Sequence, residues 1–166
     1  LGEEIGPIIG GWSPTCEREP AAIGEWGVLK TTACVWDGYD ETENKRLPED
    51  LRPVQKAEVV RNDILITRKG PMDRVGVVVH VHETRPQLMV PDTVFKTRIL
   101  EDSEMLPEFL PIALGSTPVQ RGWSQKKIGL AEAQVNLNHS ILRETPIFCP
   151  SKDEQMRIVE TLFSAR

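Results

Sequence analysis

The sequence feature that most constrains the fold is a pair of compact apolar runs separated by a short basic turn. Residues 63–67 (DILIT) and 75–81 (VGVVVHV) are rich in β-branched residues, and runs of this length and composition are typical of buried strands. Arg68 and Lys69 open the segment between them, and a Gly-Pro pair that favours a turn follows at once. The sequence therefore predicts two buried strands joined by a basic turn.

The rest of the first two thirds of the chain predicts further strands and little helix. Residues 25–36 and 92–100 are rich in β-branched and aromatic residues and predict strands, whereas residues 37–53 are polar and predict a long exposed loop. Residues 104–114 predict a short helix that two prolines interrupt. Strands that alternate with short helices and long loops, without a repeated strand–helix–strand unit, predict an α+β fold with a mixed, mostly antiparallel sheet.

The last third combines a polar segment with two helix starts. Residues 115–127 are polar and contain glycine, which predicts an exposed loop, and Asn138 is placed to cap a short helix. Ser151 and Glu154 have the spacing of a capping box. A helix is therefore predicted from there to Arg166, where its apolar stripe stops in mid-pattern, so we expect it to continue in a longer protein. The stripe consists of Met156, Ile158, Val159, Leu162 and Phe163.

Length and composition indicate one soluble domain. A chain of 166 residues, of which 39% are hydrophobic, can bury one core but is too short for two comfortable domains. No stretch approaches the roughly 20 apolar residues of a membrane-spanning helix. The opening LGEEIGPII carries acids where a signal peptide carries Lys or Arg. We therefore expect a cytoplasmic protein without a membrane partner, and the non-Met residue Leu1 suggests that the chain is cut from something larger.

Charge is unevenly distributed along the chain. The formal net charge is −5 at pH 7, which by itself disfavours a nucleic-acid partner, because domains that bind nucleic acids usually carry a basic surface. Two positive segments nevertheless stand out, since residues 45–74 hold eight bases and five acids and residues 111–130 hold three bases and no acid. The Lys and Arg side chains of these segments either lie in solvent on two separate parts of the surface or lie together on one face and bind phosphates. Composition alone leaves both interpretations open.

The cysteines and histidines do not indicate a catalytic or metal centre. His80 and His82 would point to the same face of a strand, but no acid or cysteine follows at a recognisable ligand spacing, so we predict no metal site. Cys34 paired with His80 or His82 as a nucleophile is the best enzyme alternative. The sequence has no GxxxxGK[ST] phosphate loop and no Asn-Pro-Pro-aromatic methyltransferase motif. We therefore predict a chain without catalytic residues, with a small stand-alone Cys/His hydrolase or a protein-interaction domain as the alternatives.

Four segments, taken in order, resemble a known family. They are a Gly-rich turn closed by Pro at residues 10–14 (GGWSP), a Trp-containing strand at 25–35, the two apolar runs with their basic turn at 61–79, and a closing block at 134–162 that ends in a helix with an Ile-Val pair. Their order and spacing are similar to those of a target recognition domain in the specificity subunit of type I restriction-modification enzymes. The resemblance spans nearly the whole chain.

The resemblance implies a function that spacing alone does not show. In this family two recognition domains, joined by two long antiparallel helices, each read one half of a split DNA sequence. It implies a recognition domain at residues 1–150 and the start of a conserved spacer or dimerisation helix at residues 151–166. The implied partners are double-stranded DNA, DNA adenine methyltransferase subunits, a restriction subunit, and a second recognition domain or a second copy of the chain. S-adenosylmethionine, ATP and Mg²⁺ are expected only on partner subunits, in a prokaryotic cytoplasm.

The residues expected to contact DNA belong to the two positive segments and to polar stretches near predicted strands. Cations and amides on phosphates set the register, whereas planar groups on base edges discriminate between sequences. We expect the polar loop at residues 115–127 to read bases, and the basic turn to present its cations together on a rigid scaffold. The candidates are Lys30, Thr31, Thr32, Arg68, Lys69, Arg74, Gln120, Arg121, Ser124, Gln125, Lys126, Lys127, Gln134 and Asn136.

Overall fold

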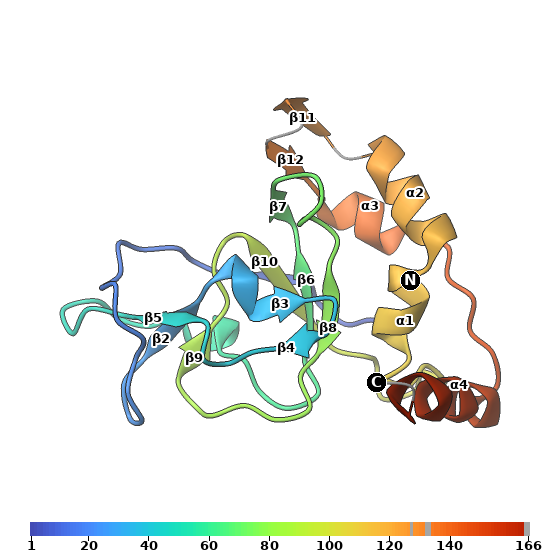
Figure 1. The fold of residues 1–166 in the computed structure, drawn as a ribbon, viewed down its shortest axis with the longest axis horizontal. Coiled ribbons are helices and arrows are strands. Elements are labelled where there is room, and N and C mark those ends of the chain that lie inside the picture. Colours follow the sequence, from blue (N-terminus) through green and yellow to red (C-terminus); the bar gives the residue numbers. More distant parts are fainter. Residues whose placement is uncertain (127, 132–133, 165–166) are drawn as a thin grey trace.

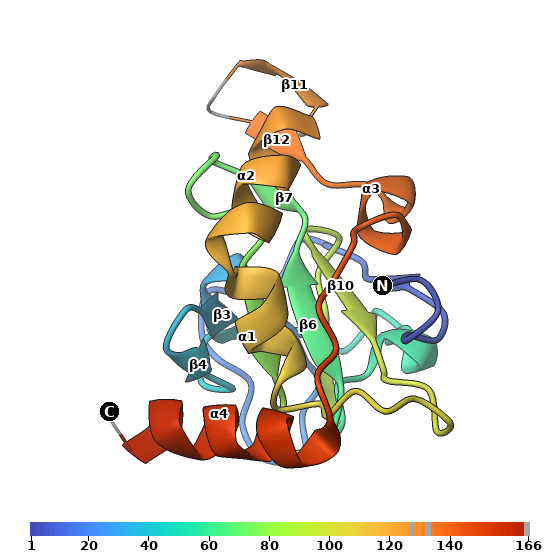
Figure 2. The same ribbon diagram turned by 90° about the vertical axis from the view of Figure 1, so that its right-hand side faces the viewer.

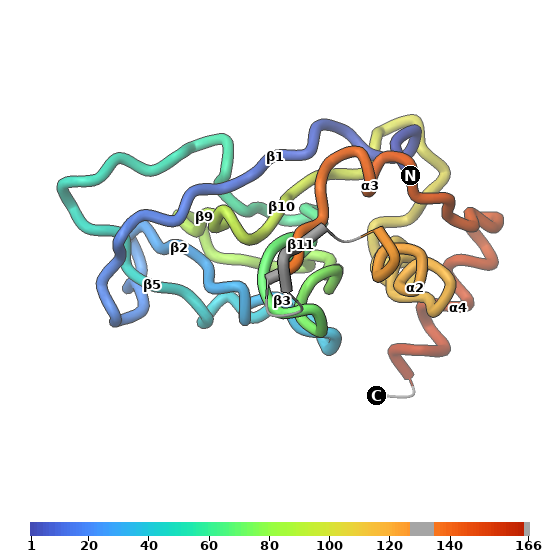
Figure 3. Tube along the Cα trace, turned by 90° about the horizontal axis from the view of Figure 1, so that it is seen from above, coloured from blue at the N-terminus to red at the C-terminus, as the bar shows by residue number. Residues whose placement is uncertain are grey.

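The computed structural model describes residues 1–126, 128–131 and 134–164, and Figures 1 and 3 show their arrangement. The strands are β1 (Ile9–Gly10), β2 (Gly27–Leu29), β3 (Cys34–Val35), β4 (Gly38–Tyr39), β5 (Asn44–Arg46), β6 (Ile64–Thr67), β7 (Lys69–Gly70), β8 (Val78–His80), β9 (Leu88–Met89), β10 (Val94–Thr97), β11 (Ile128–Ala131) and β12 (Gln134–Asn136). The helices are the 3-10 helices η1 (Thr31–Ala33) and η2 (Gln55–Ala57), and α1 (Leu110–Gly115), α2 (Thr117–Lys126), α3 (His139–Arg143) and α4 (Lys152–Ser164). The strands pair mostly antiparallel, so the predicted α+β fold is confirmed.

The two apolar runs form neighbouring strands at the centre of the fold, as predicted. The central sheet has the order β1-β10-β6-β8, and all its pairs are antiparallel. In the pair formed by the two runs, Ile64 lies opposite His80 and Ile66 opposite Val78. The strand expected within residues 92–100 is β10, which pairs with the other edge of β6.

Both faces of the central sheet are buried, which explains why its strands are apolar at consecutive positions. Successive side chains of a strand point to opposite faces, so Ile64 and Ile66 join one apolar cluster and Leu65 joins the other. Residues of α1, α2 and α3 complete the first cluster, and residues of the sheet β5-β2-β9 complete the second. Figure 2 shows α1 and α2 stacked along one side of the sheet. Burial on both faces selects nearly continuous apolar runs.

Residues 37–53 do not form one long exposed loop, so that prediction was wrong. The segment contains β4, which pairs with β3, and β5, which pairs with β2. Asn44 in β5 is buried, where its Oδ1 accepts a hydrogen bond from the Ala21 N–H (2.9 Å) and its Nδ2 donates to the Glu41 carbonyl (2.8 Å). Backbone groups make the ladder of a sheet, so a polar edge segment can form a strand without an apolar pattern.

The exposed loop predicted at residues 115–127 is also wrong, because most of this segment is the helix α2. Trp123 is 2% exposed and packs in the same apolar cluster as Phe109 and Leu110. Tertiary burial of one large side chain outweighs a composition that, read locally, favours a loop. A smaller correction concerns residues 31–33, which lie in the 3-10 helix η1 and not in a continuous strand.

The predicted helix starts are confirmed. The Asn138 side chain accepts a hydrogen bond from the Ile141 N–H (2.9 Å) at the start of α3. Ser151 Oγ accepts from the Glu154 N–H (3.4 Å), and α4 follows directly. These contacts join residues three positions apart, so the sequence alone is enough to indicate them.

Helix α4 is tied to the rest of the fold at its first turn and exposed along much of its apolar face. Gln155 is fully buried, and its Nε2 donates to the carbonyls of Pro150 (2.8 Å) and Glu104 (3.0 Å). Leu162 and Phe163 near the end of the helix are about half exposed. The division of the chain at residue 150 stays a prediction. Among the described residues, no helix has the length and apolar character needed to span a bilayer.

Candidate nucleic-acid interface

A small three-stranded sheet brings the two positive segments together. Its order is β11-β12-β7, with Asn136 opposite Lys69 and Val135 opposite Gly70. Strand β7 belongs to the first positive segment, while β11 comes shortly after the C-terminal end of α2 in the second. In Figures 1 and 2 the sheet and this end of α2 lie together at the top of the molecule. The structure therefore brings the backbones of the two positive segments to the same end of the molecule.

Arg68, at the start of the basic turn, is held by β10, by the residue before β10 and by the residue that follows β12. The Arg68 guanidinium lies over the Phe95 ring, 4.6 Å from its centroid. The Arg68 N–H donates to the Thr93 carbonyl (2.9 Å), and its carbonyl accepts from the Leu137 N–H (2.8 Å). A backbone fixed on both sides positions these cations without a large loss of conformational entropy on binding.

Two other cations of the first segment point to solvent. Lys69 Nζ lies 3.7 Å from Asp92 Oδ2, and both side chains are almost half exposed. Exposed pairs of this kind contribute about 0–1 kcal/mol, so a phosphate can replace the carboxylate at little cost. Arg74 is exposed at the end of the turn, where its carbonyl accepts a hydrogen bond from Thr67 Oγ1 (2.6 Å).

Helix α2 presents one polar face to solvent and buries the other. Arg121, Ser124, Gln125 and Lys126 are exposed, and the spacing of the first three puts them on one side of a helix. On the buried side, Trp123 Nε1 donates to Thr145 Oγ1 (2.7 Å). Within the described part of the chain, neither Arg121 nor Lys126 is in an ion pair. The face is therefore available to a polyanion.

Gln120 belongs to the same helix but is engaged within the protein. Its Nε2 donates to the carbonyls of Gly76 (3.0 Å) and Leu114 (2.8 Å). The added contact with Gly76 joins α2 to the residues that lead from the basic turn into β8. Gln120 therefore positions the interface, and its amide donors are not free to read a base.

The candidates Lys30, Thr31 and Thr32, which follow β2, divide into two groups. Thr31 Oγ1 lies 2.7 Å from Thr93 Oγ1, beside the residues that hold Arg68 and Lys69, so η1 borders the basic turn. Lys30 instead forms an ion pair with Glu43 (3.5 Å), and the Thr32 hydroxyl donates to the same carboxylate.

The last candidates lie in or near β12. Asn136 pairs with Lys69 across the strands, and its buried Oδ1 has no hydrogen-bond partner among the described residues. Gln134 belongs to β12, and Lys127 lies outside the described residues.

Sequence reasoning missed the part played by residues 92 and 93. Asp92 pairs with Lys69 and also accepts a hydrogen bond from Ser13 Oγ (2.5 Å), while Thr93 contacts Thr31 and Arg68. No local motif marks these residues, because their partners come from three distant segments. They join the opening turn, η1 and the basic turn into one continuous surface.

The enzyme alternative based on Cys34 has no support in the geometry. Cys34 is buried in β3, and burial raises the pKa of its thiol to about 12. A reactive cysteine requires the thiolate and some access to solvent. Cys34 therefore behaves as a core residue.

Comparison with known proteins identifies a similar protein and similar folds. No family model matches the chain. The chain is 37% identical over 163 residues to the specificity subunit of the type I restriction enzyme EcoEI from Escherichia coli, a match that covers 98% of this chain and 27% of the subunit. The chain thus spans about a quarter of the length of the curated relative it matches.

Two solved structures share the fold. The crystal structure of the S subunit of a type I restriction-modification system from M. genitalium superimposes with a TM-score of 0.62 at 18% identity, covering 98% of this chain and 37% of that one. A chain from a structural study of complex assembly and conformational transition in the type I system gives 0.61 at 15% identity, covering 99% and 36%. The resemblance predicted from the sequence is thereby confirmed, and the chain is similar to a part of the specificity subunits of type I restriction enzymes.

Proposed function

We propose that this chain is a sequence-specific double-stranded DNA-binding module that reads one half of a bipartite site. The observation that carries the proposal is the sheet β11-β12-β7, which joins two positive segments from distant parts of the sequence at one end of an acidic protein. A localised basic surface on a chain of net charge −5 is the electrostatic footprint of a polyanion-binding site.

The surface offers both classes of contact that sequence reading requires. Lys69 and Arg74 in the basic turn would contact phosphates and set the register. The exposed face of α2, with Arg121 and Gln125, supplies guanidinium and amide groups that can form bidentate contacts with base edges in the major groove. A helix is better suited to recognising bases than the predicted loop, because it holds its side chains at fixed spacing.

Catalysis would then be left to partners. In this proposal the chain directs DNA adenine methyltransferase subunits and a restriction subunit to their site in the cytoplasm of a prokaryote, and those subunits hold S-adenosylmethionine, ATP and Mg²⁺. Residues 1–150 would form the recognition domain, and residues 151–166 would begin the spacer helix. The half-exposed apolar face at Leu162 and Phe163 would meet a second spacer helix, from another recognition domain or a second copy of the chain.

Selection from a pool of randomised duplexes tests the proposed function. The protein should enrich one short sequence, and fluorescence anisotropy should show tighter binding to that sequence than to a scrambled duplex at the same salt concentration. Recovery of an unselected pool, or equal binding to both duplexes, would overturn the proposal of sequence recognition.

Replacing Arg121 and Lys126 together by Ala should weaken binding to the selected duplex about tenfold or more. The plot of log affinity against log salt concentration should become less steep by about 1–2, because up to two phosphate contacts are lost. The matched control replaces the exposed Arg18 and Lys152, which lie outside both positive segments, by Ala. It removes the same charge and should leave the slope unchanged. Equal effects of the two pairs would mean that only net charge matters.

A further inference from the structure

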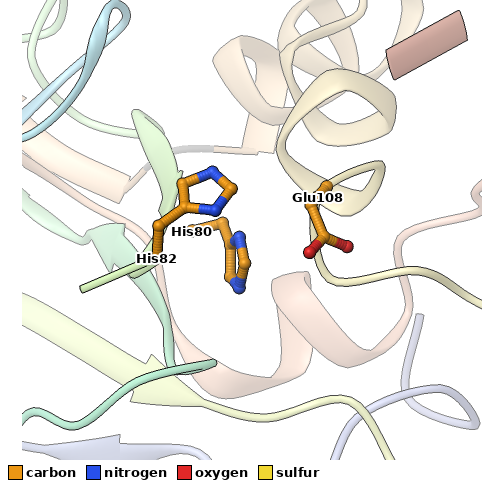
Figure 4. A group of neighbouring side chains, drawn as sticks. All are labelled: His80, His82 and Glu108. Atoms are coloured by element: carbon orange, nitrogen blue, oxygen red, sulfur yellow. The ribbon is translucent and has the colours of Figure 1, made fainter. Parts of the chain in front are cut away.

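Three potential metal ligands converge in a cavity away from the candidate interface. His80 ends β8, His82 lies two residues further on, and Glu108 precedes α1. One ligand atom of each lies within 4.8 Å of the others. They line a cavity of about 770 Å³ whose wall also includes Arg61 and Glu83. Figure 4 shows the two rings side by side and the carboxylate turned toward them.

His80 is oriented so that one ring nitrogen is available for a ligand. Its Nε2 lies 3.3 Å from Asn62 Oδ1. Because an amide oxygen only accepts, this contact is a hydrogen bond in the tautomer that carries the proton on Nε2. The lone pair is then on Nδ1, which is buried without a hydrogen-bond partner among the described residues. His80 as a whole is only 7% exposed. A hydrogen bond that fixes the tautomer of one nitrogen and leaves the other free is how proteins prepare histidine ligands.

The surroundings also favour the neutral imidazole that metal binding requires. Burial lowers the pKa of His80, and the charges of His82 and Arg61 lower it further, against the opposite effect of Glu108. A buried acceptor left unpaired is costly to the fold. The rings of His80 and His82 are in edge contact, with centroids 4.3 Å apart.

We infer that His80, His82 and Glu108 bind a divalent transition-metal ion of the zinc type. Two imidazoles and one carboxylate are a ligand set that Zn²⁺ accepts, with a fourth position left for water. Ligands of a tetrahedral ion at about 2.0–2.1 Å are ~3.3 Å apart, and rotation of the exposed His82 and half-buried Glu108 side chains can close the remaining distance. The proposal is independent of DNA binding, and it replaces the expectation from the sequence that no metal is held.

A bound ion would link parts of the fold that are far apart in the sequence. It would connect β8 of the central sheet with the segment that leads into α1. The His82 ring also lies 6.1 Å from the Phe163 ring of α4, centroid to centroid. Since an ion that binds only the folded state stabilises it by mass action, the site would secure α1 and the end of α4 against the sheet.

Titration of the untagged, chelator-treated protein with Zn²⁺ tests the site. Calorimetry should show one equivalent bound and the midpoint of thermal unfolding should rise, whereas Mg²⁺ should have neither effect because it prefers oxygen ligands. Co²⁺ should give visible absorption bands of a low-coordinate site. Nitrogen-15 spectra of the imidazoles should show that the metal binds His80 through Nδ1. Absence of Zn²⁺ binding, or signals from His139 alone, would overturn the assignment.

Variants separate this site from adventitious binding. Glu108→Gln keeps the shape of the side chain and should weaken Zn²⁺ binding about tenfold or more, with an unchanged unfolding temperature in the metal-free protein. His82→Asn should also weaken Zn²⁺ binding, and the metal-free variant should remain folded because His82 is exposed. The matched controls are His139→Asn and Cys149→Ser, which remove an exposed histidine and an exposed cysteine elsewhere. Loss of binding in a control, and retention in Glu108→Gln, would contradict the proposal.

Discussion

Replacing Asp63 by Ala should lower the free energy of unfolding by about 3–5 kcal/mol. Asp63 is fully buried immediately before β6, where its Oδ2 accepts from Lys96 Nζ (2.9 Å) and its Oδ1 from Arg98 Nε (2.6 Å). The Val60 N–H also donates to this carboxylate (2.9 Å). Removing it leaves the Lys96 ammonium, whose side chain is 10% exposed, without its counter-ion. An unpaired buried charge costs far more than a lost surface pair.

Urea unfolding followed by circular dichroism measures this effect. The control is Lys152→Ala, which breaks the exposed pair with Glu104 (3.2 Å) and should change stability by no more than about 1 kcal/mol. Adding Lys96→Met to Asp63→Ala should recover part of the loss, because the unpaired charge is then gone. If Asp63→Ala and Lys152→Ala have similar effects, the buried ion pair does not stabilise the fold as described.

Replacing Trp123 by Ala should cost about 3–5 kcal/mol of stability and also weaken DNA binding. The ring is fully enclosed, and a Cβ added at Gly76 would lie 3.0 Å from it, so α2 closely contacts the residues that follow the basic turn. Its Nε1 also donates to Thr145 (2.7 Å). Loss of the ring therefore removes the contact that holds the exposed face of α2 next to the basic turn.

Trp123→Phe is the matched control for this prediction. It keeps most of the apolar volume but loses the hydrogen bond to Thr145, so a smaller loss of about 1 kcal/mol is expected, with near-normal affinity for the selected duplex. Affinity is compared at a temperature where both variants are folded by circular dichroism. If folded Trp123→Ala binds DNA like the parent protein, the position of α2 does not determine recognition.

The sequence predicted those parts of the fold whose signals are local. The strands β6 and β8 follow from β-branched runs. The start of α3 follows from Asn138, whose side chain accepts a hydrogen bond from the N–H of Ile141, three residues further on. Helix α2 was mistaken for a loop because Trp123 depends on Thr145 and Gly76, which no local pattern connects with it. Strand β5 was missed because its polar residues pair through backbone groups.

In the candidate sites, too, the sequence predicted local relations between residues but not contacts between distant segments. The spacing of His80 and His82 indicates that they share a face of a strand, but only the fold brings Glu108 to them from the segment before α1. The amide of Gln120 was expected at DNA and instead contacts the protein backbone. The direction of a side chain depends on the partners that surround it, and these come from other segments.

By itself, then, the amino-acid sequence determined the class of fold, the central strand pair, the helix caps, the family resemblance and the two positive segments, because each of these follows from neighbouring residues or from their order along the chain. Only the tertiary structure decided that β12 joins the two positive segments, by pairing with β7 and β11, and that α2 presents Arg121 while burying Trp123. The physical reason is that strand pairing and burial join residues far apart in the chain, and the free energy of those contacts overrides local preference.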